Sequence, residues 1–334
     1  MVKKIMFLVA PFCFSAVRQD NAKLRLSHPE KLIDIGGYKL HINGTGNSSN
    51  TGPTVILDSC MGGSFVCWAL VQPEVAKFVR VCSYDRAGLG WSDESPYQRS
   101  SKYMVEELHK LLENSGERGP YILVGHSSGG INMRLYANMY PEQVYGVILV
   151  DASHEDQLEV FKEIDARVPV EVWQTAKNWF VSTRFCVVCA HVLETCHIIS
   201  PNVNTMVPAG QRELIKFLES SPKAQKTGGA EEANFATSMQ QLKDSANRLE
   251  DKPLIVITAR RNWDEYYPQF GSARMREYQQ VWSDFQKDFL TKSCKSKQIF
   301  AEKSGHFVVW DQPEVIVDAI RLMVEQYQKD QLGS

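Results

Sequence analysis

The sequence predicts an α/β fold: a mostly parallel, twisted sheet with helices on both faces and a helical cap insertion. Short runs rich in β-branched and aromatic residues alternate with amphipathic segments along most of the chain. The 334 residues are 43% hydrophobic and 23% charged, which suffices for a large core. Residues 153–250 show no convincing strand pattern. We therefore expect a sheet core from residues 28–152 and 251–334, and a helical cap, or lid, from residues 153–250.

The elements of the core follow one another in a regular order. Residues 31–44 are typical of a hairpin that turns at Gly36 and Gly37. Helices are expected at 101–116 and 131–140, where apolar residues recur at helical spacing and a glycine or a proline marks the end. Core strands are expected at residues 54–59, 79–85, 121–127, 144–153, 253–259 and 297–305.

The expected cap combines apolar helical segments with a polar stretch. Its aromatic residues Trp173, Trp179, Phe180 and Phe185 offer an apolar lining above the carboxyl ends of the strands, where open α/β sheets bind ligands. Residues 220–233, rich in serine, lysine and glycine, are predicted to form a loop. The cysteines between positions 186 and 197 have helical spacing in an apolar segment, so we expect buried free thiols and no metal site.

A candidate nucleophile lies in the sequence Gly-His-Ser-Ser-Gly, which begins at Gly125. It matches G-x-S-x-G between a predicted strand and a predicted helix. On so sharp a turn, a side chain at Gly125 or Gly129 would collide with the neighbouring strand or helix. Ser127 is then exposed at the end of the sheet, next to the free N–H groups of a helix N-terminus. We expect Ser127 to be the nucleophile and Ser128 to donate its N–H to an oxyanion.

A serine hydroxyl needs a base within hydrogen-bonding reach. His306 follows the last predicted strand and precedes a helix that begins near Pro313, so it lies at the same edge of the sheet as Ser127. Most of the other histidines lie on helix faces, after the hairpin or in the insertion. His306 is therefore the expected base.

These motifs together resemble the α/β-hydrolase superfamily, in particular its serine hydrolases of the esterase-like branch with an inserted cap. The resemblance covers most of residues 30–330. It rests on Gly-His-Ser-Ser-Gly-Gly, on Tyr-Asp-Arg-Ala-Gly-Leu-Gly-Trp-Ser-Asp at 84–93, and on Ser-Gly-His-Phe around His306. The family order of serine, acid and histidine implies an acid in the loop after residues 253–259, where Asp264 is the expected residue. Glu265 in the same loop and Asp151, one strand earlier, are the alternatives.

The resemblance also implies a second oxyanion donor after the strand at 54–59. Relatives often have His-Gly there, whereas this chain has Ser59 and Cys60, so by position Met61 supplies the N–H. Gly62 and Gly63 allow the loop a tight path. Asp85 and Arg86 are expected to hold the loop by hydrogen bonds.

The expected chemistry is acyl transfer to Ser127 followed by hydrolysis, with a small to medium apolar ester or lactone as substrate. No metal or organic cofactor is required. Epoxide hydrolases and dehalogenases of the fold use a carboxylate nucleophile, which Ser127 disfavours. The alternatives are another serine activity of the fold (a carbon–carbon bond hydrolase, a lyase or a peptidase) and a hydrolase-like receptor for a small ligand.

The net charge of the chain and its first 20 residues bear on its binding partners and its cellular location. The net charge of −2 and the absence of lysine- or arginine-rich runs exclude a nucleic-acid-binding surface of the usual kind. Residues 1–20 place two lysines before a short apolar run, as secretory signals do. We expect export or loose membrane association in preference to a cytoplasmic location. The alternative is an apolar segment packed on the domain.

Overall fold

The computed structural model describes residues 31–47, 52–166, 209–262 and 272–333. Its centre is an eight-stranded sheet in the order β1-β2-β4-β3-β5-β6-β7-β8. β2 pairs antiparallel with β1 and β4, and the remaining neighbours are parallel. The strands are β1 (Lys31–Asp34), β2 (Lys39–Thr45), β3 (Thr54–Asp58), β4 (Arg80–Tyr84), β5 (Tyr121–His126), β6 (Val144–Val150), β7 (Leu254–Ala259) and β8 (Ser296–Ala301). The predicted mostly parallel sheet is confirmed.

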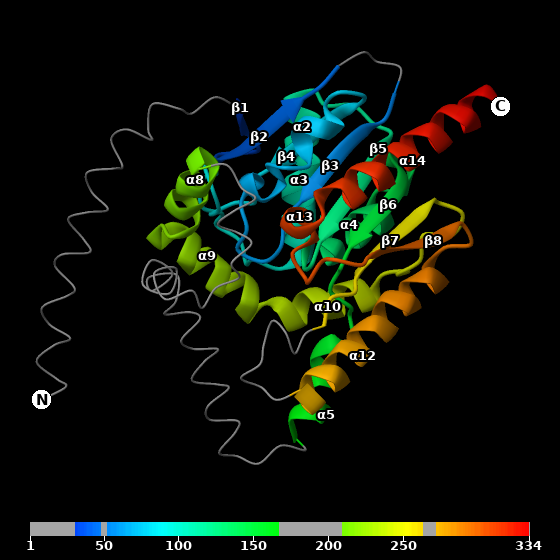
Figure 1. The fold of residues 1–334 in the computed structure, drawn as a ribbon. Helices are drawn as coiled ribbons and strands as arrows, with labels where there is room; N and C mark the ends of the chain where they lie inside the picture. The colour runs from blue at the N-terminus through cyan, green and yellow to red at the C-terminus, as the bar shows by residue number, and fades with distance from the viewer. Residues whose placement is uncertain (1–30, 48–51, 167–208, 263–271, 334) are drawn as a thin grey trace, which may run out of the picture.

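Helices cover both faces of this sheet (Figure 1). One face packs against α3 (Ser101–Ser115), α4 (Gly129–Met139) and α10 (Phe235–Asp244). The other packs against η2 (Phe65–Trp68), α2 (Gln72–Val75), α13 (Val308–Asp311) and α14 (Pro313–Leu332). Alternate residues of β5 enter the two layers: Leu123 contributes to the first, and Ile122 and Val124 to the second. The central strands are apolar on both sides because both sides are buried.

The described part of residues 153–250 is helical. It comprises α5 (Gln157–Ala166), α8 (Ala209–Glu219), α9 (Pro222–Ala233) and α10, and the last three follow one another along one side of the molecule (Figure 1). The remaining elements are η3 (Pro141–Gln143), α12 (Ser272–Asp288) and η5 (Phe289–Lys292). The aromatic residues expected to line the cap, from Trp173 to Phe185, lie outside the described residues.

The loop predicted at residues 220–233 is wrong, because most of this segment forms α9. Ser221 caps the helix by accepting a hydrogen bond from the N–H of Ala224, and Pro222 occupies the first turn. Thr227 and Glu231 are buried against the core, so tertiary contacts offset the low helix propensity of the two glycines.

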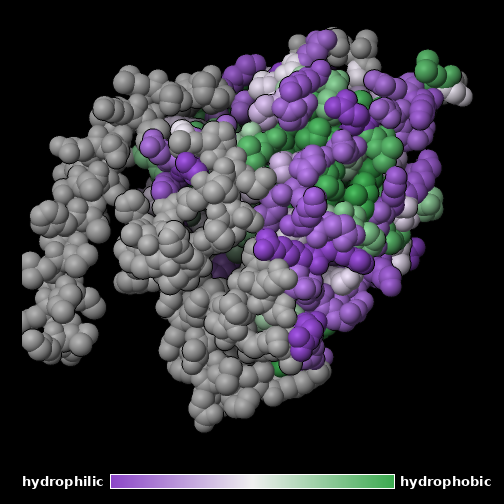
Figure 2. Space-filling view, viewed as in Figure 1, coloured by the Kyte–Doolittle hydropathy of each residue, from purple (hydrophilic) through white to green (hydrophobic). Residues whose placement is uncertain are grey.

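Polar side chains are spread over the described part of the face in Figure 2, with apolar ones visible between them. Among the described residues no helix is long and apolar enough to cross a membrane. Residues 1–20, on which the expectation of export or membrane association rests, lie outside the described residues.

Candidate active site

The turn between β5 and α4 holds Ser127 in a left-handed backbone conformation, with φ of 55°. A Cβ atom at Gly125 would lie 2.5 Å from the carbonyl oxygen of Gly129, and one at Gly129 would lie 2.6 Å from that of Asp58. Both distances are far below van der Waals contact, so the turn excludes every residue except glycine at these positions. The steric reason given for the two glycines is confirmed.

The Ser127 hydroxyl faces the ring of His306. Its Oγ lies 3.0 Å from His306 Nε2, and His306 Nδ1 lies 2.7 Å from Oδ2 of Asp151. A carboxylate only accepts hydrogen bonds, so Nδ1 donates to Asp151, and Nε2 is left to accept from the serine hydroxyl. The structure thus brings together a hydroxyl, a base and an acid in the order that activates a nucleophile.

Asp151, one of the two alternatives, occupies the place expected for Asp264. Asp264 and Glu265 lie outside the described residues. Asp151 follows β6, the neighbour of β5, and has a left-handed backbone conformation with φ of 42°. It is fully buried, and its Oδ1 accepts a hydrogen bond of 3.0 Å from the N–H of Ala259. Asp264 was expected to accept the hydrogen bond from His306 Nδ1. In the structure Asp151 accepts it.

His126, which was not among the residues expected in the site, holds the backbone of His306 by a hydrogen bond. It is fully buried, and its Nε2 donates a 2.9 Å hydrogen bond to the carbonyl oxygen of His306. The indole ring of Trp282 lies edge-on to the His306 ring, with 5.5 Å between centroids. The position of His126, directly before the nucleophile in the motif, was the signal that could have identified it.

The two expected oxyanion donors are free to act. Neither the N–H of Met61 nor that of Ser128 has an acceptor among the described residues. The loop that carries Met61 is held in place, because Gly63 N–H donates to the carbonyl of Cys60 over 3.0 Å, and Gly62 N–H donates to Glu231 of α9 over 2.8 Å.

Arg86 holds the same loop by hydrogen bonds to its backbone. It is 3% exposed and donates to the carbonyl oxygens of Ser59 and Cys60. It also forms ion pairs of 2.6 Å with Asp58 and 2.7 Å with Glu231. Burial alone would lower the pKa of Arg86, but the charges of Glu231 and Asp58 raise it well above its ordinary value. The guanidinium therefore stays charged and joins the loop, β3 and α9.

Asp85 completes the attachment of the loop. It accepts hydrogen bonds from Phe65 N–H over 2.8 Å and from His41 Nδ1 over 2.7 Å. The role expected for Asp85 and Arg86, which is to hold the loop, agrees with these contacts.

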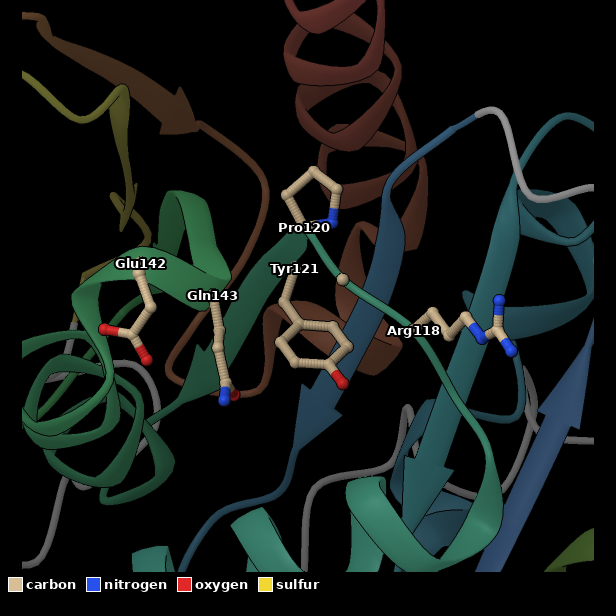
Figure 3. Close-up of a pocket in the computed structure, with 6 residues that line it drawn as sticks. Arg118, Pro120, Tyr121, Glu142 and Gln143 are labelled. Carbon is tan, nitrogen blue, oxygen red and sulfur yellow. The ribbon is translucent and has the colours of Figure 1, made fainter.

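Two hollows differ in their relation to Ser127. A small hollow of about 10 Å³ lies beside the expected oxyanion donors. Its walls are Met61, Arg86, Ser101, Met104, Ser128, Asn132, Glu231, Phe235 and Ser238. A wider hollow of about 450 Å³ is formed by the segment around Pro120 and by η3 (Figure 3). It lies at the start of β5, whereas Ser127 follows the end of that strand, so it is not part of this site.

Among the described residues, one group of potential metal-ligating atoms is brought together. His154, Glu155 and Asp288 lie close to one another. Lys292 Nζ lies 3.1 Å from both carboxylates, and Arg134 forms a 2.8 Å ion pair with Glu155. These cations neutralise the carboxylates, and the group is an ion-pair cluster that ties the segment after β6 to α12.

Comparison with known proteins identifies the family. The model of the alpha/beta hydrolase fold matches residues 53–313, and the chain belongs to that family. "Probable transporter efuK" of Hormonema carpetanum is 27% identical over 90% of this chain, although the chain spans only 44% of that protein.

Solved structures show the same fold at low identity. A "probable hydrolytic enzyme" of Pseudomonas aeruginosa PAO1 is 18% identical with a TM-score of 0.66, and the match covers 89% of this chain and 95% of that one. The epoxide hydrolase CorEH is 15% identical with a TM-score of 0.59 over 90% and 99% of the two chains. These likenesses show the fold, and the family match places the chain in the α/β-hydrolase family.

Proposed function

We propose that this protein is a serine hydrolase that cleaves a small to medium ester or lactone through an acyl-enzyme intermediate. The observation that carries the proposal is the contact of 3.0 Å between Ser127 Oγ and His306 Nε2, with Asp151 on the opposite side of the imidazole. A weakly acidic hydroxyl becomes nucleophilic when a base accepts its proton as it attacks.

The groups of the site act in a fixed order in this mechanism. Ser127 Oγ attacks the acyl carbon while His306 Nε2 takes its proton, and Asp151 stabilises the imidazolium that forms. The N–H groups of Met61 and Ser128 donate to the oxyanion of the tetrahedral intermediate, at the positive end of α4. His306 then protonates the leaving alcohol. In the second half, His306 takes a proton from the water that attacks the acyl-enzyme, and it returns this proton to Ser127 Oγ as the acid leaves.

The nucleophile decides between this chemistry and that of the epoxide hydrolases with the same fold. Epoxide opening in that branch relies on a carboxylate, which forms an ester with the substrate. The elbow of this chain offers a hydroxyl instead, and the Asp58 carboxylate at the end of the neighbouring strand is paired with Arg86 and Asn132. The described residues therefore favour acyl transfer to Ser127.

An apolar wall beside the base supports an apolar substrate. Trp282 contacts the ring of His306 and stacks with Phe161 of α5, which also packs against Tyr278. Apolar and aromatic side chains of this kind line the acyl or alcohol pockets of small-molecule sites, with few polar groups to fix orientation.

A substrate panel tests the proposal. p-Nitrophenyl esters of graded chain length, aliphatic lactones and terminal epoxides would be offered to the wild-type protein and to Ser127→Ala and Ser115→Ala. We expect turnover of esters or lactones, a loss of about a thousandfold or more in Ser127→Ala, and no change in Ser115→Ala, whose residue lies at the far end of α3. Turnover of epoxides alone would contradict the proposal. Binding of esters without turnover would favour the small-ligand receptor.

A further inference from the structure

Two cysteines meet beneath the loop that carries Met61. The turn from Cys60 to Gly63 and the next, in which Cys67 N–H donates to Ser64 over 3.1 Å, fold the chain back on itself. A Cβ atom placed on Gly63 would lie 3.0 Å from the sulfur of Cys60 and 3.0 Å from that of Cys67. Both thiols are free, and they pack against the same side of Gly63. Cys60 is partly exposed, whereas Cys67 is buried.

The sheet register places this thiol pair next to the serine. Asp58 at the end of β3 lies opposite Gly125 of β5. Cys60 and Ser127 each follow two residues later, at the same carboxyl edge of two parallel strands. Any change at Cys60 therefore acts on the loop that holds Met61.

The side chain of His126 also interacts with Cys60. Its Nε2 is used by the carbonyl of His306, and its Nδ1 has no close hydrogen-bond partner. The Cys60 thiol and the His126 side chain interact, which lowers the pKa of the thiol and raises the pKa of the imidazole. A protonated histidine beside a thiol is a common means of stabilising a thiolate.

The surroundings favour a charged Cys60 and a neutral Cys67. Hydrogen bonding from Cys67, opposed by burial and aided by His126 and Arg86, lowers the pKa of the Cys60 thiol well below its ordinary value. The same contact and burial raise the pKa of Cys67 well above it. Glu219 of α8 faces the pair, with its Oε1 3.8 Å from the Cys67 sulfur. The negative charge of Glu219 disfavours a thiolate at Cys67.

We infer that Cys60 is a peroxide-reactive nucleophile and that Cys67 is its resolving thiol, so that the two form a reversible disulfide under the Met61 loop. The Cys60 thiolate attacks one oxygen of hydrogen peroxide or an alkyl hydroperoxide, so an S–O bond forms, the O–O bond breaks and hydroxide or alkoxide leaves. The Cys67 sulfur then attacks the sulfenic acid at Cys60, and its proton leaves with the hydroxyl group as water. Two thiols are oxidised and one peroxide is reduced.

A consequence for turnover rests on the proposed function. To form the bond, the two sulfurs must close to about 2 Å, which draws Cys60 toward Cys67 and shifts the neighbouring Met61 N–H away from the oxyanion. The disulfide should therefore slow ester hydrolysis and leave the fold intact.

The test uses the full-length reduced protein, a pulse of dilute hydrogen peroxide, alkylation with iodoacetamide and tryptic mass mapping. Cys60 and Cys67 lie on one tryptic peptide, residues 40–77, and they are its only cysteines. We expect this peptide to lose two hydrogens and to resist alkylation. The disulfide should form at least about tenfold faster than the exposed Cys294 is oxidised. Reduction with dithiothreitol should restore both alkylation sites. Oxidation of Cys294 ahead of the 40–77 peptide would overturn the inference.

Variants assign the two roles. In Cys67→Ser the sulfenic acid at Cys60 should persist and be trapped by dimedone, whereas Cys60→Ser should leave Cys67 reduced. Cys294→Ser is the matched control and should not alter the reaction. Formation of the same disulfide in Ser127→Ala would show that the thiol chemistry stands independently of ester hydrolysis. If Cys67→Ser does not fold, the wild-type time course still decides, since sulfinic acid at Cys60 without a disulfide would exclude Cys67 as the resolving thiol.

Discussion

Asp151 Oδ2 and His306 Nδ1 lie 2.7 Å apart, and this contact joins the ends of two distant segments of the chain. Asp151 follows β6 and His306 follows β8, with β7 between the two strands in the sheet. The carboxylate is held by Ala259 N–H at the end of β7. The strand between them therefore helps to position the acid for the base.

The first prediction concerns this acid. Asp151→Asn should lower ester turnover by about three to four orders of magnitude, because the amide no longer fixes the imidazole tautomer or stabilises its charge. Its Oδ1 can still accept from Ala259, so the protein should remain folded by circular dichroism. Asp264→Asn and Glu265→Gln serve as matched variants and should retain activity. The reverse pattern, with activity lost in Asp264→Asn alone, would show that Asp151 is not the acid.

The elbow glycines give a prediction about stability. Gly125→Ala should lower the free energy of unfolding by about 3 kcal/mol or more, because its Cβ would meet backbone atoms of α4 that cannot move aside. Gly229→Ala in α9 is the control, since nothing lies within 4 Å of its Cβ position. It should be neutral or stabilise the protein by up to about 1 kcal/mol. Urea denaturation measures both, and equal midpoints for the two variants would refute the steric account.

Glu231 links the helical insertion to the core through a buried charge. Glu231→Ala should destabilise the protein by about 3 to 5 kcal/mol, since it leaves Arg86 buried with one carboxylate fewer. It should also slow turnover, because Gly62 N–H loses its acceptor in the Met61 loop. The comparison is Glu94→Gln, which breaks the exposed pair with Lys226 and should not measurably change the denaturation midpoint. A harmless Glu231→Ala would mean that α9 does not stabilise this loop.

Glu219 gives the protein a pH-dependent stability. Burial, followed by the charge on Cys60, raises the pKa of Glu219 from 4.5 to about 7. The folded state then binds a proton more tightly than the unfolded state, so stability falls as pH rises from about 4.5 to about 7. The loss amounts to no more than about 3 kcal/mol.

Glu219→Gln removes this titration and can still accept hydrogen bonds from Ser64. The variant should be more stable than the wild type at pH 8, and the difference should vanish near pH 4. Urea denaturation at several pH values measures the effect. Parallel pH curves for the two proteins would contradict the assignment.

Patterns along the chain predicted the parts of the fold that depend on local chemistry. The hairpin at Gly36 and Gly37, the parallel core strands and the turn at Ser127 follow from alternation, burial and steric exclusion. The strand expected at 144–153 ends earlier, at Val150, because Asp151 adopts a left-handed conformation. The residue pattern did not predict this conformation.

Features that depend on tertiary contacts were harder to predict. The two glycines and the polar residues of 220–233 favoured a loop, but a capped first turn and the buried contacts of Glu231 stabilise α9. The choice of Asp264 rested on where the family usually places its acid. Asp151 was one of the two alternatives, and the feature that favours it is tertiary, because β6 lies beside β5 and sets Asp151 near the edge that carries Ser127.

The central claim is that His306 and Asp151 activate Ser127 as a nucleophile. The most direct measurement is the rate of labelling by a fluorophosphonate, with the modified residue identified by mass mapping, in the wild type and in Ser127→Ala and His306→Ala. We expect a single phosphonylated peptide modified at Ser127, no labelling in Ser127→Ala and labelling slowed by about a hundredfold or more in His306→Ala. A folded wild-type protein that is not labelled, or that is labelled equally fast without His306, would contradict the account.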